Sequence, residues 1–325
     1  MKTLDKTSLL TGALAGVTVV LLLLGASTQS ILVGVLLVAS AILPVLIAGL
    51  GWGNVAAMAA VLVAGLGLAL ISTPLDALST VALMLAPAAW LSHVANLARP
   101  ASELGGPEDT LAWYPLSDIL IQIVVLVIVA VLINGAISGY NYDLTSLMVD
   151  QVVVAMKTQD PLYDLSSAAI DRMKSAVYIG SPMFFGAIWV MILFAGYYVA
   201  NRIVQLSGKN LRPREDMPST LRMHRYSIFA FLGGLVLVFM GGNFAMIGAL
   251  ICGTFGAGFV LAGFAVFHFR TRGKSWRLPV LWLGYLSVTF VFPAFFFLLS
   301  GLMDTRRAIA LSPAGKTTET ETKDL

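Results

Sequence analysis

The segment AILPVLIAGLGWGNVAAMAAVL, residues 41 to 62, decides how this chain must fold. It is apolar enough to lie inside a bilayer, yet its centre is GLGWGN (49–54), which is rich in residues that disfavour a continuous helix. A single crossing needs about 20 apolar residues, and the apolar sequence from 31 to 71 is long enough for two. We therefore predict two spans joined by a tight turn, with Trp52 at the membrane surface, where indole rings are favoured.

The composition of the whole chain is typical of a polytopic membrane protein. Of its 325 residues, 58% are apolar and 11% are charged, with a mean hydropathy of +0.88, whereas soluble domains average about 25% charged residues. We predict an all-α, polytopic integral membrane helical bundle of eight or nine transmembrane helices, forming one domain over 1–303 and followed by a polar, disordered tail over 304–325. The nine expected spans are 8–26, 31–50, 53–71, 77–97, 116–138, 178–204, 226–242, 244–269 and 278–302.

Lysine and arginine residues predict the orientation of the chain. With a cytoplasmic N-terminus, 13 of the 20 basic residues fall in cytoplasmic segments, mainly the loops 205–225 and 270–277. The more acidic segment 139–177 then lies outside, as two amphipathic helices near 144–157 and 162–176. We predict a multi-pass inner-membrane protein with its N-terminus in the cytoplasm. Nine spans place the C-terminus outside, whereas the basic residues just after the last span fit eight or ten.

No pattern of an enzyme or a metal site is present in the sequence. It contains no HExxH, no Walker A loop and no G-x-S-x-G elbow, and its single cysteine, Cys252, rules out paired cysteine ligands. The acidic residues nearest the spans, Asp76, Asp118 and Asp304, lie at predicted span ends, which does not favour a buried proton relay. We predict no enzymatic activity, no catalytic residue, no metal and no cofactor.

The polar residues of the early spans suggest a ligand-binding site. In APAAWLSHVANLAR, Trp90 and His93 are three residues apart, so they lie on adjoining parts of one helix face. Trp52 and Asn54 belong to the predicted turn, which meets the same side of the membrane. We take these four as candidate ligand-binding residues. Each also has a structural explanation, because tryptophans form interfacial belts and lone polar side chains join helices.

Several short motifs resemble known families. The succession LPVLIAGLGWGNVAA, LAPAAWLSH, WYPLSD and PAFFFLLSGLMD resembles the YybS-like family of bacterial polytopic membrane proteins, whose domain has no known function. The proline-bearing span, glycine turn and small-residue span between Pro44 and Gly67 are also similar to the substrate-binding components of energy-coupling-factor vitamin transporters. That second resemblance implies a solute-binding fold in the first five or six spans. This chain is longer than those components, carries the additional segment 139–177 and lacks a clear Ala-x-x-x-Ala motif in its first span.

Two functions fit these observations. The first is a transporter-like protein that binds a small solute or a lipid within the bundle, because broken helices beside polar residues line cavities at membrane depth. The alternative is a non-transporting assembly or interaction protein that holds a membrane or cytoplasmic protein partner through its basic loops. Membrane lipids are expected partners in both cases, and nucleic acid is not, because no RNA-binding module is recognisable. A partly polar cavity would favour the first function, and a dry core the second.

Overall fold

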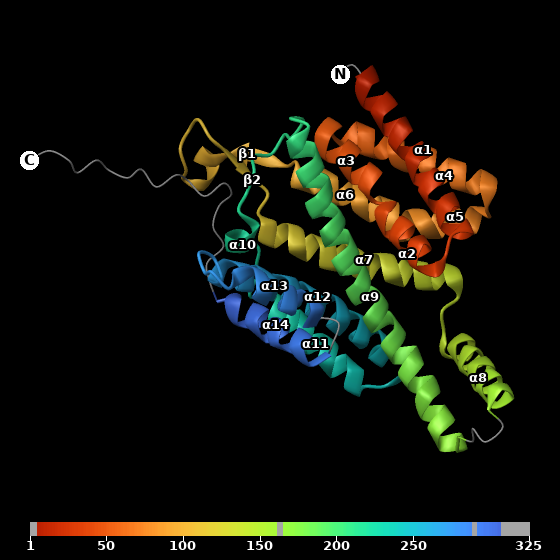
Figure 1. Cartoon of the computed structure of the whole chain (residues 1–325). Helices are drawn as coiled ribbons and strands as arrows, with labels where there is room; N and C mark the ends of the chain where they lie inside the picture. Colours follow the sequence, from red (N-terminus) through yellow and green to blue (C-terminus); the bar gives the residue numbers. More distant parts are fainter. Residues whose placement is uncertain (1–4, 161–164, 288–290, 307–325) are drawn as a thin grey trace, which may run out of the picture.

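The computed structural model of the chain is an all-α membrane protein (Figure 1). It describes residues 5–160, 165–287 and 291–306. Within these residues, seven helical segments are long and apolar enough to cross a membrane, and two shorter apolar helices accompany them. The strands of the described chain, β1 (Ala98–Pro100) and β2 (Leu111–Trp113), form one small antiparallel hairpin between spans. The predicted all-α polytopic bundle is confirmed.

The GLGWGN segment is the turn that the sequence predicts. Helix α3 (Leu43–Trp52) ends and α4 (Asn54–Ile71) begins on either side of Gly53, which has φ 85° and ψ −177°. Glycine adopts this conformation readily because it has no Cβ. Helix α2 (Ile31–Ser40) lies directly before α3, and together they make one span. The two predicted spans and the turn between them are therefore confirmed.

Small residues hold the first span against this hairpin. Helix α1 (Lys6–Thr28) contacts α4 along its length, and Gly12 and Gly16 lie at the contact. A Cβ at Gly16 would be 2.7 Å from the carbonyl oxygen of Ala60, and one at Gly12 would clash with that of Ala56. The Gly12-x-x-x-Gly16 spacing thus permits the close helix approach that such motifs provide in membranes.

The fourth span is irregular at its centre. It runs through α5 (Pro74–Thr80), a π-helical segment η1 (Val81–Leu85) and α6 (Ala86–Ala95). Pro87 has no N–H to give to the carbonyl four residues earlier, and the N–H of Ala86 bonds to Val81 five residues back. The π turn therefore adapts the helix to the proline.

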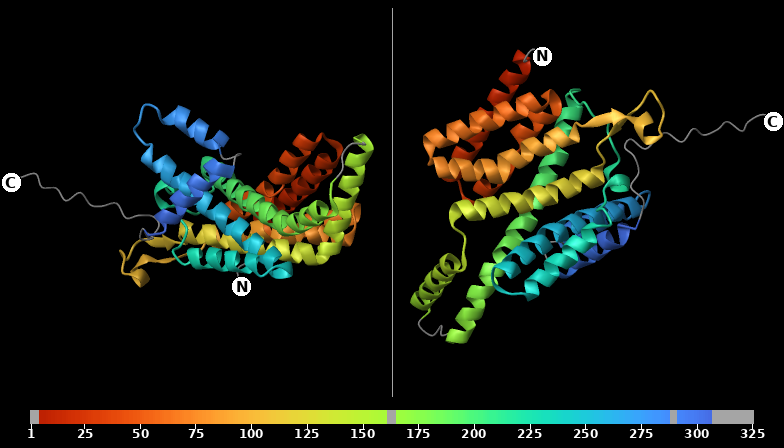
Figure 2. Two further views of the ribbon diagram at one scale, coloured as in Figure 1. Left: turned by 90° about the horizontal axis from the view of Figure 1, so that it is seen from below. Right: turned by 180° about the vertical axis from the view of Figure 1, so that it is seen from behind.

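Two central helices connect the halves of the molecule. Figure 2 shows α7 (Leu116–Ser138) and α9 (Ser167–Leu206) lying between the group α1–α6 and the group α10–α14, which begins with α10 (Met217–Thr220) and ends with α14 (Val291–Asp304). With 40 residues, α9 is about 60 Å long, twice the ~30 Å hydrocarbon thickness of a bilayer. Its first turns extend beside α8 (Tyr142–Gln159). The predicted helix near 144–157 is thus confirmed, whereas the separate amphipathic helix near 162–176 is wrong: residues 167–176 continue into α9, and 161–164 lie outside the described residues.

The group α10–α14 differs from the sequence-based prediction over residues 278–302. The segment expected as one span, 278–302, is two helices, α13 (Arg277–Ser287) and α14 (Val291–Asp304). Helix α14 crosses α12 (Gly242–Arg270) where Gly263 meets Gly301 without room for a Cβ on either. In the views of Figures 1 and 2, α14 ends on the side of the molecule where α12 ends. The pair α13–α14 therefore enters the bundle and returns. The helices of this group are α10 (Met217–Thr220), α11 (Ser227–Phe239), α12 (Gly242–Arg270), α13 (Arg277–Ser287) and α14 (Val291–Asp304).

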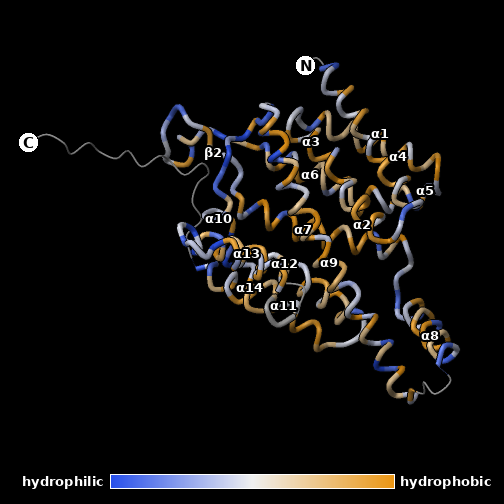
Figure 3. The backbone as a smooth tube through the Cα atoms, viewed as in Figure 1, coloured by the Kyte–Doolittle hydropathy of each residue, from blue (hydrophilic) through white to orange (hydrophobic). Residues whose placement is uncertain are grey.

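One end of the bundle gathers most of the polar loops, and we call it the basic end. It carries the start of α1, where Ser8 Oγ donates to the carbonyl of Trp52 (3.3 Å), and the loop 207–216, where Arg212 Nη1 donates to the carbonyl of Ala95 (3.3 Å). Figure 3 shows hydrophilic residues at the β hairpin and at the loops beside α10 and α13. Helices of mainly apolar residues lie between these loops and α8. We call the opposite end the α8 end.

Candidate functional site

Two of the four predicted site residues contact each other. Trp90 and His93 lie on α6 with ring centroids 6.1 Å apart. The indole Nε1 of Trp90 donates to Gln122 Oε1 on α7 (3.2 Å), although the Trp90 side chain is 51% exposed. Trp90 therefore joins α6 to α7 at the outer surface of the bundle, in the manner of an interfacial tryptophan.

The other two predicted residues lie at the turn between α3 and α4. Trp52 is half-buried and Asn54 is exposed. Within the described part of the chain, no hydrogen bond or ring contact joins either residue to Trp90 or His93. The amide that binds this turn is instead Asn96, whose Nδ2 donates to the carbonyl oxygens of Gly49 (3.0 Å) and Leu50 (3.4 Å).

A cleft lies away from these four residues, between α7, α9 and α12 at the α8 end. Its volume is about 540 Å³, within the ~300 to 1,000 Å³ of typical small-molecule sites. Its wall on α12 extends to Leu250, eight residues beyond the first residue of that helix, or about 12 Å at 1.5 Å per residue. The cleft thus reaches most of the ~15 Å to the bilayer midplane. Its apolar wall is formed mainly by Val131, Leu132, Phe185, Ile188, Met246 and Leu250.

A proline in α9 shapes the mouth of the cleft. Pro182 has no N–H, so the carbonyl of Tyr178 loses its usual helical donor. The hydroxyl of Tyr140 donates to that carbonyl instead (2.9 Å), and the Tyr140 and Tyr178 rings stack with centroids 5.7 Å apart. The Tyr178 hydroxyl in turn donates to Asn243 Oδ1 (2.7 Å), which fixes α9 to the start of α12. Burial raises the pKa of Tyr140, so its hydroxyl stays protonated and able to donate near neutral pH.

The polar rim of the cleft offers mainly hydrogen-bond acceptors. Each rim hydroxyl already donates to a main-chain carbonyl: Ser138 to Gly135 (3.3 Å), Ser181 to Val177 (2.7 Å) and Tyr140 to Tyr178. A hydroxyl that donates its proton still has lone pairs to accept with. Asn134 completes the rim and donates one amide N–H to Ser79 Oγ on α5. No charged residue lines the described cleft, so the rim favours a ligand that donates hydrogen bonds over a phosphate or carboxylate.

The cleft could not be assembled from the sequence. Its residues come from three segments that are about 40 to 60 residues apart in the sequence. Within its own segment, none of these residues forms a motif that indicates a binding site. Pro182 inside the predicted span 178–204 was the available signal, because a proline within a transmembrane helix frees a carbonyl that needs another donor.

Comparison with known proteins gives no further guidance, because no family model, curated protein or solved structure matches the chain. The resemblance to the YybS-like family and to energy-coupling-factor components therefore stays a prediction. Among the described residues, no group of three or more His, Cys, Asp or Glu side chains could hold a metal ion.

Proposed function

We propose that this multi-pass membrane protein is transporter-like and binds a lipid or lipid-like molecule in the cleft between α7, α9 and α12. The observation that carries the proposal is the pairing of a deep apolar wall with an uncharged rim of acceptor oxygens. An apolar chain would occupy the wall, and a headgroup bearing hydroxyl, amide or amine donors would occupy the rim. This narrows the sequence-based choice between a solute and a lipid.

The rim must supply the selectivity of such a site. Lipid tails in the bilayer are as apolar as leucine side chains, so moving a chain from the bilayer into the cleft gains little free energy. Each hydrogen bond at the rim contributes about 0.5 to 1.5 kcal/mol, a factor of about 2 to 10 in affinity. Lipids that share a tail should therefore be distinguished by their headgroups.

Irregular hydrogen bonding in two spans supports the transport part of the proposal. Pro182 interrupts the hydrogen bonding of α9 at the cleft, and η1 interrupts the fourth span. Both segments stay helical, but a proline and a π turn are positions at which a helix can bend. Residues of both halves contact α7 and α9, so a relative movement of the halves would change the shape of the cleft that these two helices form with α12.

The orientation belongs to the same proposal. We propose a cytoplasmic N-terminus in a bacterial inner membrane, with the basic end inside. The gathering of the start of α1, the α3–α4 turn and the basic loops at one end supports this arrangement, because cytoplasmic loops carry an excess of lysine and arginine.

Native mass spectrometry of the detergent-purified protein tests the binding site. Gly135 lines the cleft, and a Cβ there would meet only Tyr140 Cβ, at 3.7 Å. Gly135→Leu should therefore fold and fill the cleft. Gly233→Leu on α11 makes the same change at an exposed position where a Cβ has open space. We expect diacylglycerol to bind the native protein and Gly233→Leu, and to bind Gly135→Leu about tenfold more weakly or not at all. Equal binding to the two variants would reject the cleft as the site.

Transport is tested separately from binding. Reconstituted vesicles with a fluorescent lipid alcohol in one leaflet should show faster exchange between leaflets with the native protein than with Gly135→Leu. Binding without exchange would favour the alternative of a non-transporting assembly protein.

A further inference from the structure

A second pocket lies at the basic end, away from the cleft of α7, α9 and α12. Its volume is about 360 Å³, and it is enclosed by the last turns of α9 and the segment 214–218 that leads into α10. Its polar lining consists of Asn201, Arg202 and Gln205 on α9 with Arg214, Glu215 and Asp216 on the facing segment.

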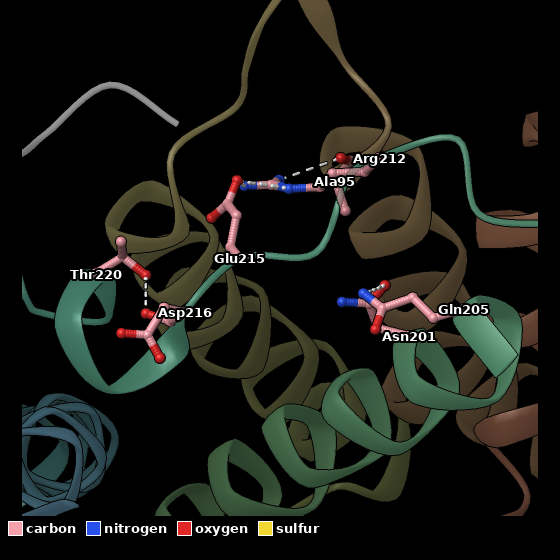
Figure 4. A network of polar contacts seen from close by, with 7 residues as sticks. All are labelled: Ala95, Asn201, Gln205, Arg212, Glu215, Asp216 and Thr220. Atoms are coloured by element: carbon pink, nitrogen blue, oxygen red, sulfur yellow. Dashed lines mark hydrogen bonds and ion pairs between the residues drawn. The ribbon is translucent and has the colours of Figure 1, made fainter. Parts of the chain in front are cut away.

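Both acidic residues of this pocket are neutralised by arginines that do not line it. Glu215 binds Arg212, with Oε1 3.0 Å from Nε and 2.5 Å from Nη2, and both side chains are only 5% exposed (Figure 4). Asp216 forms an ion pair with Arg272, beyond the end of α12. The hydrogen bond from Arg272 lowers the pKa of Asp216, which keeps that carboxylate ionised and paired at neutral pH. The two arginines therefore offset both negative charges, although Glu215 Oε2 is buried and has no hydrogen-bond partner among the described residues.

The two arginines of the lining have no such partner. Arg202 and Arg214 are exposed, and within the described residues neither makes a hydrogen bond or an ion pair, although the charge of Arg214 also helps to lower the pKa of Asp216. Once the two acid–arginine pairs are set aside, the pocket carries two positive charges. Guanidinium groups match the oxygens of phosphate with paired hydrogen bonds, which makes arginine the usual choice for phosphate recognition.

The residues around Arg202 and Arg214 also suit a phosphate group. Figure 4 shows Asn201 and Gln205 facing the 212–216 segment from α9. Gln205 Nε2 lies 3.5 Å from Asn201 Oδ1, which leaves the Asn201 amide hydrogens available to donate. Arg214 lies between two anchored positions, since Arg212 binds the carbonyl of Ala95 and Asp216 binds Arg272. This anchoring holds the Arg214 backbone in place before any ligand arrives, which reduces the ordering cost of binding.

We infer that this pocket binds a phosphate group through Arg202 and Arg214. The phosphate could belong to a lipid headgroup, because Tyr198 in the lining is half exposed beside the end of a span, or to a soluble phosphate compound that enters from the aqueous side. The chemistry recognised is the same for both sources. The ligand differs from that of the acceptor-rimmed cleft, which has no cation to hold a phosphate.

The test compares two double variants in dodecyl maltoside, a detergent without phosphate. Arg202→Gln/Arg214→Gln removes both pocket charges, and Arg99→Gln/Lys274→Gln removes two exposed charges elsewhere at the basic end. One arm titrates glycerol 3-phosphate by calorimetry, and the other titrates short-chain phosphatidic acid by native mass spectrometry. Diacylglycerol is the phosphate-free match; it is expected to bind in the cleft of α7, α9 and α12, so its binding should not differ between the two double variants. In at least one arm, we expect the phosphate compound to bind the native protein and the control variant alike. It should bind the pocket variant at least about tenfold more weakly.

The pattern across the arms identifies the source of the phosphate. Binding of phosphatidic acid alone assigns a lipid headgroup, and binding of glycerol 3-phosphate alone or of both assigns a phosphate group reached from water. Arg202→Lys/Arg214→Lys should retain part of the affinity, because lysine keeps the charge but not the paired hydrogen bonds. The inference is wrong if neither compound binds, or if the pocket and control variants lose affinity equally, which would indicate a diffuse effect of positive charge.

Discussion

The hydroxyl of Tyr140 replaces the helix hydrogen bond that Pro182 removes from α9. Tyr140→Phe keeps the ring that stacks on Tyr178 but deletes the donor 2.9 Å from the Tyr178 carbonyl. An unsatisfied buried acceptor costs about 1 to 3 kcal/mol, whereas single hydrogen bonds within membranes average about 0.6 kcal/mol. We expect Tyr140→Phe to lower the free energy of unfolding by about 1 to 2 kcal/mol, within the range that these values define.

A double-mutant cycle with Pro182→Ala measures this effect by denaturant unfolding in detergent. Alanine at 182 restores an N–H that can donate to the Tyr178 carbonyl, so Tyr140→Phe should then cost about 0.5 kcal/mol or less. Tyr142→Phe is the matched control, because the Tyr142 ring packs edge-on against Tyr178 at 5.6 Å and no hydrogen bond of its hydroxyl is part of the cluster. If Tyr140→Phe costs the same with proline and with alanine at 182, or no more than Tyr142→Phe, then Tyr140 does not replace the hydrogen bond that Pro182 removes.

Three further substitutions test other parts of the structure. Asn96→Ala should lower the free energy of unfolding by about 1 to 3 kcal/mol, because it removes the donor to the Leu50 carbonyl, while the Gly49 carbonyl keeps the N–H of Gly53. Exposed Asn54→Ala should change it by about 0.5 kcal/mol or less; similar losses in denaturant unfolding would contradict the assignment. Gly301→Leu should abolish most of the folded yield measured by size-exclusion chromatography, because its Cβ would clash with the α12 backbone, while Gly233→Leu should not; equal yields would remove the proposed crossing. Asp216→Asn should cost at most about 1 kcal/mol at pH 7, since the ion pair is about half exposed. The Arg272 partner lowers the pKa of Asp216 in the folded protein. The stability difference between the native protein and Asp216→Asn should therefore be complete above the pKa of the unfolded chain, near 4, and disappear as the pH falls through the pKa of the folded protein. A difference that persisted at lower pH would exclude the ion pair as its cause.

Local patterns predicted the parts of the fold that local physics determines. The turn at Gly53 follows from a glycine-rich centre in an apolar stretch too long for one crossing. The missing Cβ of Gly12 and Gly16 permits the close contact of α1 with α4, although these residues alone do not indicate which helix lies against them. In both cases the decisive property, a missing Cβ, belongs to the residue itself and needs no knowledge of the rest of the molecule.

The parts that were not predicted depend on contacts between distant segments. Hydropathy cannot distinguish one crossing from two short helices over 278–302, because both bury apolar residues; the division and the return of α14 depend on its packing against Gly263. Helical periodicity likewise could not show that residues 167–176 continue into a span. Among the polar residues, proximity in sequence identified the Trp90–His93 contact, but the partner of the α3–α4 turn, Asn96, was evident only from the tertiary structure.

The central claim is that a lipid-like molecule with a donor headgroup occupies the cleft of α7, α9 and α12. Photo-crosslinking in native membranes with a diazirine-bearing diacylglycerol, followed by mass spectrometry of the labelled peptides, tests it most directly. We predict labelling concentrated in residues 131–140, 181–188 and 246–250, reduced by excess unlabelled diacylglycerol and absent from Gly135→Leu. Labelling spread evenly over the outward faces of the spans, or unchanged in Gly135→Leu, would contradict the claim.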